Sequence, residues 1–212
     1  MPVQEIHAHK FAKSSILSSY QMPKVIPPIE VIRVLNKAKI RFVLVGAYGL
    51  VGWRKESRAT EDVDVLVGVR HLKKAVEVLL KAFPDLEPVD LPAVVRLRER
   101  DTEDVLIDVM KPLQQPYCEA LKNTVMVDSE GEKYRIPTLE MAVAMKFSAM
   151  ISPYRAAEDK HDDARDFIRM VKYNPELDEK KTADLASLIY PDGGKYILNL
   201  IRQARAGETL VI

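Results

Sequence analysis

The sequence is poor in cysteine, in long apolar runs and in net charge, and each shortage excludes a class of protein. Cys118 is the only cysteine, which excludes an internal disulfide framework and a cysteine-rich zinc site and fits the reducing cytoplasm. The 32 basic residues nearly balance the 31 acidic ones, so the net charge of +1 gives no overall attraction to nucleic acid or an anionic membrane. Apolar runs such as residues 42–45 are far shorter than the roughly 20 residues that cross a bilayer. We therefore expect a cytoplasmic protein without a membrane segment.

The chain has enough apolar residues for a core, and its residue pattern changes at two places. Hydrophobic residues make up 47% of the 212 residues, which is sufficient for one ordinary domain with a helical addition. Prolines at positions 23, 27 and 28 separate the first segment from the rest, and the chain after Pro137 has a helical pattern. We predict an N-terminal arm over 1–28, a core over 29–137 and a C-terminal helical region over 138–212.

Hydrophobic periodicity predicts a mixed α/β (α+β) core, in which helices flank a sheet. Alternation with period two indicates strands, and apolar residues three or four apart indicate amphipathic helices. On this basis the expected strands cover residues 41–45, 62–67, 94–98, 105–110, 124–127 and 134–136. The expected helices begin near 29, 70, 139 and 156, with a short helix over 47–53 and two more helices beyond 171. The last four strands form two predicted hairpins.

The predicted strand at 62–67 begins with two acids on one face. Asp62 and Asp64 are two residues apart, so their side chains project together, roughly 6.6 Å apart along the strand. Two ionised carboxylates that face the same way repel each other, and a cation between them relieves that repulsion. Magnesium is the natural candidate because its ligands are hard oxygen atoms.

A third acid interrupts an otherwise apolar strand. Asp108 shares a strand face with Leu106 and Met110, and a lone carboxylate in such a place needs a partner. If this strand pairs with the one at 62–67, Asp108 completes a three-carboxylate cluster suited to two-metal phosphoryl chemistry. The alternative interpretation is structural: Asp62 caps a turn, Asp64 is solvated, and Asp108 pairs with Arg96 or Arg98.

A glycine turn precedes these acids. The strand at 41–45 ends at Gly46 and continues into a short helix, which exposes backbone amides and the positive end of a helix dipole. Both features favour the binding of phosphate groups. A phosphate cradle therefore precedes a candidate metal site.

The residues just described resemble the polymerase β-like nucleotidyltransferase superfamily. That family has a glycine-glycine or glycine-serine turn followed by acid-x-acid, and here Val45-Gly46-Ala47-Tyr48-Gly49-Leu50 is followed by Arg58-x-Thr60-x-Asp62-Val63-Asp64-Val65. Residues 29–172 carry the resemblance, and they are most similar to the minimal bacterial and archaeal branch that includes AbiEii-type toxins of abortive-infection systems. Ala47 departs from the pattern because it lacks a hydroxyl that could contact phosphate.

The resemblance implies roles for individual residues. Asp62, Asp64 and Asp108 match the family's carboxylates and would hold Mg²⁺ or Mn²⁺. The implied nucleotide-binding positions, on the turn, the following loop and two C-terminal helices, are Gly46, Ala47, Arg58, Thr60, Lys146, Lys160 and Asp163. From spacing alone, Lys160, Asp163 and Asp166 would equally form an exposed ion-pair stripe along one helix face.

The implied activity is metal-dependent transfer of a nucleoside monophosphate from ATP or another nucleoside triphosphate to a hydroxyl acceptor. By analogy with the branch, the acceptor would be a transfer RNA or a protein, and the enzyme would be a toxin with an antitoxin partner. Fold analogy is a weak basis for the acceptor. Two alternatives stay open: an inactive nucleotide- or partner-binding module, which Ala47 favours, and a metal-dependent phosphodiester hydrolase that uses water as acceptor.

Overall fold

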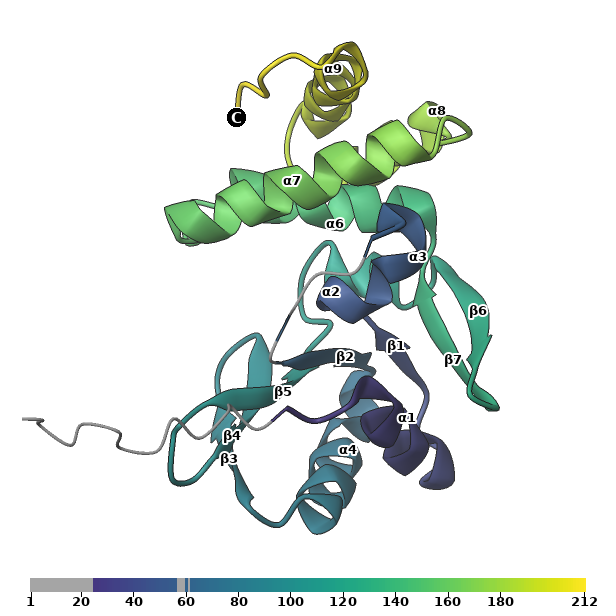
Figure 1. The fold of residues 1–212 in the computed structure, drawn as a ribbon. Coiled ribbons are helices and arrows are strands. Elements are labelled where there is room, and N and C mark those ends of the chain that lie inside the picture. Colours follow the sequence, from purple (N-terminus) through teal and green to yellow (C-terminus); the bar gives the residue numbers. More distant parts are fainter. Residues whose placement is uncertain (1–24, 57–59, 61) are drawn as a thin grey trace, which may run out of the picture.

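The computed structural model describes residues 25–56, 60 and 62–212, and within these residues the strands form one seven-stranded sheet (Figure 1). Arg58 and most of the predicted arm at 1–28 lie outside the described residues. The strands are β1 (Phe42–Leu44), β2 (Val63–Val67), β3 (Leu86–Asp90), β4 (Val94–Glu99), β5 (Val105–Met110), β6 (Thr124–Ser129) and β7 (Glu132–Pro137), in the spatial order β3-β4-β5-β2-β1-β7-β6.

The sheet is mixed, as the sequence predicts. The β2–β5 and β1–β7 pairs are parallel, and the remaining pairs, including the two predicted hairpins, are antiparallel. The pairing that matters most joins β2 to β5, because these two strands carry the acids of interest. That adjacency, which the sequence alone does not establish, is present.

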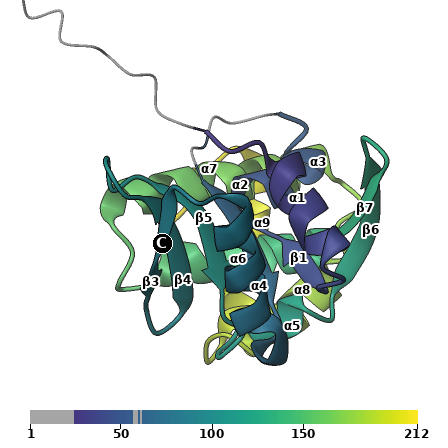
Figure 2. The same cartoon turned by 90° about the horizontal axis from the view of Figure 1, so that it is seen from below.

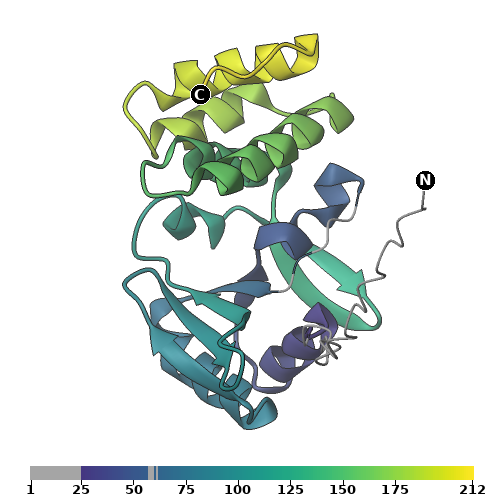
Figure 3. The ribbon, with the colours of Figure 1, turned by 60° about the vertical axis from the view of Figure 1, so that its left-hand side comes forward.

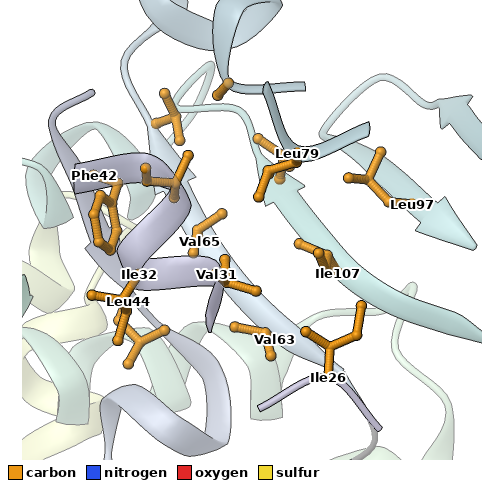
Figure 4. Close-up of a cluster of buried hydrophobic side chains, with 14 of the residues drawn as sticks. Ile26, Val31, Ile32, Phe42, Leu44, Val63, Val65, Leu79, Leu97 and Ile107 are labelled. Carbon is orange, nitrogen blue, oxygen red and sulfur yellow. The ribbon is translucent and has the colours of Figure 1, made fainter. Parts of the chain in front are cut away.

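One face of the sheet is covered by α1 (Pro28–Lys37) and α4 (Val69–Ala82), which lie in front of it in Figure 2. Proline at the first position of α1 has a backbone angle suited to helix entry. The apolar faces of both helices bury a core against the sheet, where Val31, Leu79, Val65 and Ile107 are fully enclosed (Figure 4). Each such side chain contributes about 1.5 to 3 kcal/mol relative to exposure. Since Val63 and Val65 point into this core, Asp64 faces the other side.

The opposite face carries α6 (Leu139–Ile151), which is buried on nearly all sides. Met141 and Ala144 of α6 pack toward the sheet, while Val143 and Phe147 pack against the later helices. A helix that is apolar all round belongs inside a fold, and Thr138 begins it by accepting a hydrogen bond from the Met141 amide at 3.3 Å.

The later helices stack beyond α6, at the end of the molecule away from α1 and α4 (Figure 3). They are α7 (Ala157–Tyr173), α8 (Glu179–Ser187) and α9 (Gly193–Ala206). The predicted boundary near residue 137 falls between β7 and α6. None of the helices in the described part of the chain is long and apolar enough to cross a membrane.

Three details differ from the sequence prediction. The single helix expected over 47–53 is broken at Leu50 into α2 (Gly46–Gly49) and α3 (Val51–Arg54). Strand β3 was not predicted, because Pro88 weakens the strand signal; the strand lies at the sheet edge, where proline is tolerated. The short helix α5 (Tyr117–Ala120) was also missed, since four residues carry little periodicity.

Candidate functional site

Three carboxylates meet on the sheet face beneath α6. The parallel register pairs Asp64 of β2 with Asp108 of β5, so both side chains leave the sheet on the same side. Asp62, just before β2, joins them, and one oxygen from each of the three lies within 4.8 Å of the others. We call Asp62, Asp64 and Asp108 the acid cluster.

The acid cluster is electrostatically strained. Burial and, to a smaller extent, the negative charges of Asp62 and Asp108 together raise the pKa of Asp64 from its ordinary value to about 7. Burial likewise raises the pKa of Asp108 to about 6, although Arg96 opposes that shift. Carboxylates held this close resist ionisation, and a bound cation would reverse the shift.

Gly46 allows the chain to pass directly over the acid cluster. Its φ of +59° lies in the left-handed region, and a β-carbon at this position would overlap the Asp64 carboxylate, with only 2.6 Å to Cγ. The Val45 amide donates to the Asp64 carbonyl at 3.0 Å, which fixes this approach. No other residue type fits Gly46 without displacing Asp64.

The turn at Gly46 and Ala47 differs from the expected phosphate cradle in one respect. Helix α2 has four residues, so its dipole is small, and any contact with phosphate would depend on backbone amides instead. Ala47 is buried, and it lines the same cavity as the acid cluster together with Gly46.

Thr60 lies beside the acid cluster and contacts it directly. Its hydroxyl donates to Asp62 Oδ1 at 2.6 Å, and its carbonyl accepts from the Tyr48 hydroxyl at 3.5 Å. In the structure Thr60 therefore orients Asp62. Its predicted contact with nucleotide stays a prediction.

A cavity of about 600 Å³ opens above the acid cluster, between the sheet and the helices. The acid cluster on the sheet forms the first wall of this cavity. The second wall is formed by the helical side, with Ser148, Ala149 and Ser152 near the end of α6 and with Lys146, Arg155 and Asp163. A third side is formed by residues 114–117, including Tyr117, whose pKa is raised by burial and by the nearby charge of Asp64. The volume lies in the range typical of small-molecule sites.

The second wall carries basic side chains held by acids of α7. Lys146 Nζ donates to Asp163 Oδ1 at 2.7 Å and lies 2.9 Å from Asp166 Oδ2. Arg155 Nε donates to the other oxygen of Asp163 at 2.7 Å. Behind them, Arg54 Nε lies 3.0 Å from Asp166 Oδ1, with both side chains buried. We call Arg54, Asp166, Lys146, Asp163 and Arg155 the ion chain.

The sequence-predicted residues thus divide between two places. Lys146 and Asp163 line the cavity of the acid cluster, whereas Lys160 lines a separate cavity of about 540 Å³ with His161, Tyr190 and Tyr196. The alternative prediction, an exposed ion-pair stripe along α7, is wrong for Asp163 and Asp166, because both side chains are buried. Arg155 was missed, because it lies in the turn before α7 and belongs to no motif.

Asp108 has one basic neighbour within the described residues. Arg96 Nε of β4 lies 3.7 Å from Asp108 Oδ1, so the alternative pairing is partly realised. The distance is too long for a hydrogen bond, and Oδ1 is buried and accepts none from the residues that are described. The Arg96 side chain is half exposed.

These observations fit a divalent metal. Three oxygen donors converge, their negative charges repel one another, and a buried oxygen of Asp108 lacks a hydrogen bond within the described structure. Hard carboxylate oxygens suit Mg²⁺ or Mn²⁺ better than softer metals. The acid cluster can therefore hold such an ion.

No family model and no curated protein matches the sequence of the chain. Solved structures do match. A nucleotidyltransferase-like protein from Paracoccidioides brasiliensis is 19% identical over 86% of this chain and 91% of its own, with a TM-score of 0.51. The antibiotic-resistance factor ANT(2'')-Ia is 12% identical over 74% and 86%, with a TM-score of 0.50. At such identities the similarity concerns the fold alone, and that fold is of the nucleotidyltransferase type.

Proposed function

We propose that this protein is a metal-dependent nucleotidyltransferase, which moves a nucleoside monophosphate from a nucleoside triphosphate to a hydroxyl acceptor. The observation that carries the proposal is the pairing of two walls across one cavity: the acid cluster on the sheet, and Lys146 with Arg155 on the helices. A triphosphate with its metal presents negative oxygens and positive charge together, and this cavity offers a complement to each.

Asp62, Asp64 and Asp108 would hold Mg²⁺ or Mn²⁺, which supplies positive charge to the reacting phosphate. Backbone amides at Gly46 and Ala47, with the charges of Lys146 and Arg155, would bind the phosphate oxygens. Arg58 and Lys160 stay predictions for this role, the first outside the described residues and the second on another cavity.

The chemical step is an in-line displacement at the α-phosphorus. The acceptor oxygen forms a bond to phosphorus while the bond to the α–β bridging oxygen breaks, and pyrophosphate leaves. In this proposal the acceptor's proton passes to the Asp108 carboxylate, which lies in the acid cluster and lines the cavity. Positioning and electrostatics supply most of the catalysis.

We further propose, on the motif resemblance, that the acceptor is a transfer RNA or a protein and that the enzyme acts as a toxin of the AbiEii type with an antitoxin. The similar structure ANT(2'')-Ia is described as an antibiotic-resistance factor. A small hydroxylated acceptor is therefore included among those to be tried.

The test is incubation with each α-labelled triphosphate, Mg²⁺ and extracts of RNA, protein and small molecules, for wild type and Asp62→Ala/Asp64→Ala. We expect label to enter one acceptor fraction, with pyrophosphate released, in the wild type only. Free nucleoside monophosphate as the sole product would establish the hydrolase instead. Metal-dependent nucleotide binding without turnover would establish the inactive binding module.

A further inference from the structure

The ion chain runs from the interior of the protein to the wall of the cavity. Its charges alternate in sign along Arg54, Asp166, Lys146, Asp163 and Arg155, with four successive contacts of 3.0, 2.9, 2.7 and 2.7 Å. Because each acid lies between two basic groups, every charge in the chain is compensated by a neighbour.

The two ends of the ion chain have different environments. Lys146, Asp163 and Arg155 line the cavity, and the charges of Lys146 and Arg155 act on Asp64 across it. Arg54 and Asp166 are fully buried and do not belong to the cavity lining of the described residues. Asp166 therefore acts on the cavity through its contact with Lys146.

Arg54 also connects the chain to the Gly46 turn. It is the last residue of α3, which follows α2 and the turn directly, and α3 contacts α7 (Figure 1). The Asn174 amide donates to the Trp53 carbonyl at 2.8 Å, and Arg169 pairs with Glu56 at 2.8 Å. The Arg54–Asp166 pair thus joins the segment that carries one side of the cavity to the helix that carries the other.

A buried ion pair is a costly way to join two helices, since apolar side chains of similar size are often as stable. An apolar pair would leave the Lys146 ammonium with Asp163 as its one acidic contact among the described residues, whereas Asp166 holds it from a second side and is itself neutralised by Arg54. The retained charges at Arg54 and Asp166 are explained by this positioning requirement.

We propose that Arg54 and Asp166 are positioning residues, which fix the Lys146 ammonium opposite the Gly46 turn at the separation that a triphosphate chain requires. The inference rests on the proposed function, because it assumes that Lys146 and the turn bind the same phosphate chain. It assigns no contact between substrate and either positioning residue.

The test compares wild type with Arg54→Leu/Asp166→Leu by calorimetry, with Mg²⁺ alone and then with inorganic triphosphate in saturating Mg²⁺. We expect Mg²⁺ affinity to stay within about twofold, because the acid cluster is intact, and triphosphate affinity to fall at least about tenfold. A general structural defect would weaken both ligands together. The control Asp162→Ala/Arg165→Ala removes an exposed ion pair of α7 and should change neither affinity.

Asp166→Asn is the second variant, in case the double variant does not fold. It keeps the shape of the side chain while removing its charge, and we expect triphosphate affinity to fall about threefold or more with Mg²⁺ affinity unchanged. Wild-type triphosphate affinity in a folded variant would overturn the positioning role alone. If the wild type binds Mg²⁺ but no triphosphate, the proposed function fails first and the positioning role with it.

Discussion

The acid cluster and the ion chain both contain aspartates, but the charged neighbours of those aspartates differ. In the ion chain, two buried aspartates, Asp163 and Asp166, lie within 3.0 Å of basic groups. In the acid cluster, three aspartates lie together, and the nearest described basic group, Arg96, is 3.7 Å from one of them. Compensated acids hold a structure together, whereas uncompensated acids favour a cation from outside.

The comparison also separates stability from function. Folding alone would place a basic residue beside each acid of the cluster, as it does along the ion chain. The structure instead leaves Asp64 with a pKa raised to about 7 and brings Gly46 into contact with it. Strain of this kind is typical of functional sites, and each prediction below tests one side of the contrast.

The largest expected effect is on the ion chain. Asp166→Ala removes an acid that contacts both buried Arg54 and Lys146, and the loss of one partner of a buried ion pair costs about 3 to 5 kcal/mol. We expect the free energy of unfolding in urea to fall by that amount. Asp162→Ala, which removes an exposed acid from the same helix, should cost less than about 1 kcal/mol. Equal effects of the two substitutions would show that burial of the ion chain does not increase the contribution of its acids to stability.

The acid cluster should respond in the opposite direction, because its acids repel one another. We expect Asp64→Asn to raise the stability of the metal-free protein at pH 8 and to abolish its response to Mg²⁺. In the wild type, Mg²⁺ at a hundred times its dissociation constant should stabilise the fold by about 2.7 kcal/mol. Thermal unfolding with and without Mg²⁺ measures both effects.

The dependence of that Mg²⁺ response on pH gives a second check. Asp64 and Asp108 have pKa values raised to about 7 and 6, so the protonated forms, which cannot bind metal, increase as pH falls from 8 to 5. The stability of the metal-free protein should change with pH in the opposite direction. Neutral Asp64 favours the folded state at low pH, and this contribution is lost as pH rises from the ordinary pKa of 3.8 through the raised pKa of about 7. A Mg²⁺ response that grew on acidification would contradict a carboxylate site.

Local patterns in the sequence predicted the acid cluster well, because its geometry follows from strand periodicity. Asp62 and Asp64 are two residues apart where the chain enters β2, so their side chains project to the same side, and Asp108 needed only the pairing of β2 with β5. The family resemblance supplied that pairing. The sequence also predicted the mixed sheet and the helical second half, since those elements are long and periodic.

The ion chain was not predicted, because its contacts join residues far apart in the sequence. Arg54 and Asp166 belong to helices separated by more than 100 residues, and nothing local marks either as buried. Helix spacing placed Lys160 with Asp163, whereas the side chain that meets Asp163 is Lys146 of α6. Packing between helices decides such partners, and spacing along one helix cannot.

Gly46 offers a matched pair of substitutions. Gly46→Ala places a β-carbon against the Asp64 carboxylate at a φ of +59°, so we expect a loss of about 2 kcal/mol in stability and a weaker Mg²⁺ response. Gly52→Ala in α3 adds the same atom where nothing lies within 4 Å, and should be neutral or stabilising by less than about 1 kcal/mol. Urea unfolding and Mg²⁺ titration of both variants decide whether close approach to Asp64 matters.

The smallest expected effect concerns Arg96, which is the described basic residue that lies nearest to an aspartate of the acid cluster. Its side chain is half exposed and 3.7 Å from Asp108, so Arg96→Gln should change stability by less than about 1 kcal/mol. If Asp108 binds metal, removal of this competing charge should raise Mg²⁺ affinity by up to about fivefold. Arg98→Gln, on the same strand but paired with Glu87 and Glu103, should leave Mg²⁺ affinity unchanged. A loss of stability above 1 kcal/mol with unaltered Mg²⁺ affinity would make Asp108 the structural partner of Arg96, and the metal would then rest on Asp62 and Asp64 alone.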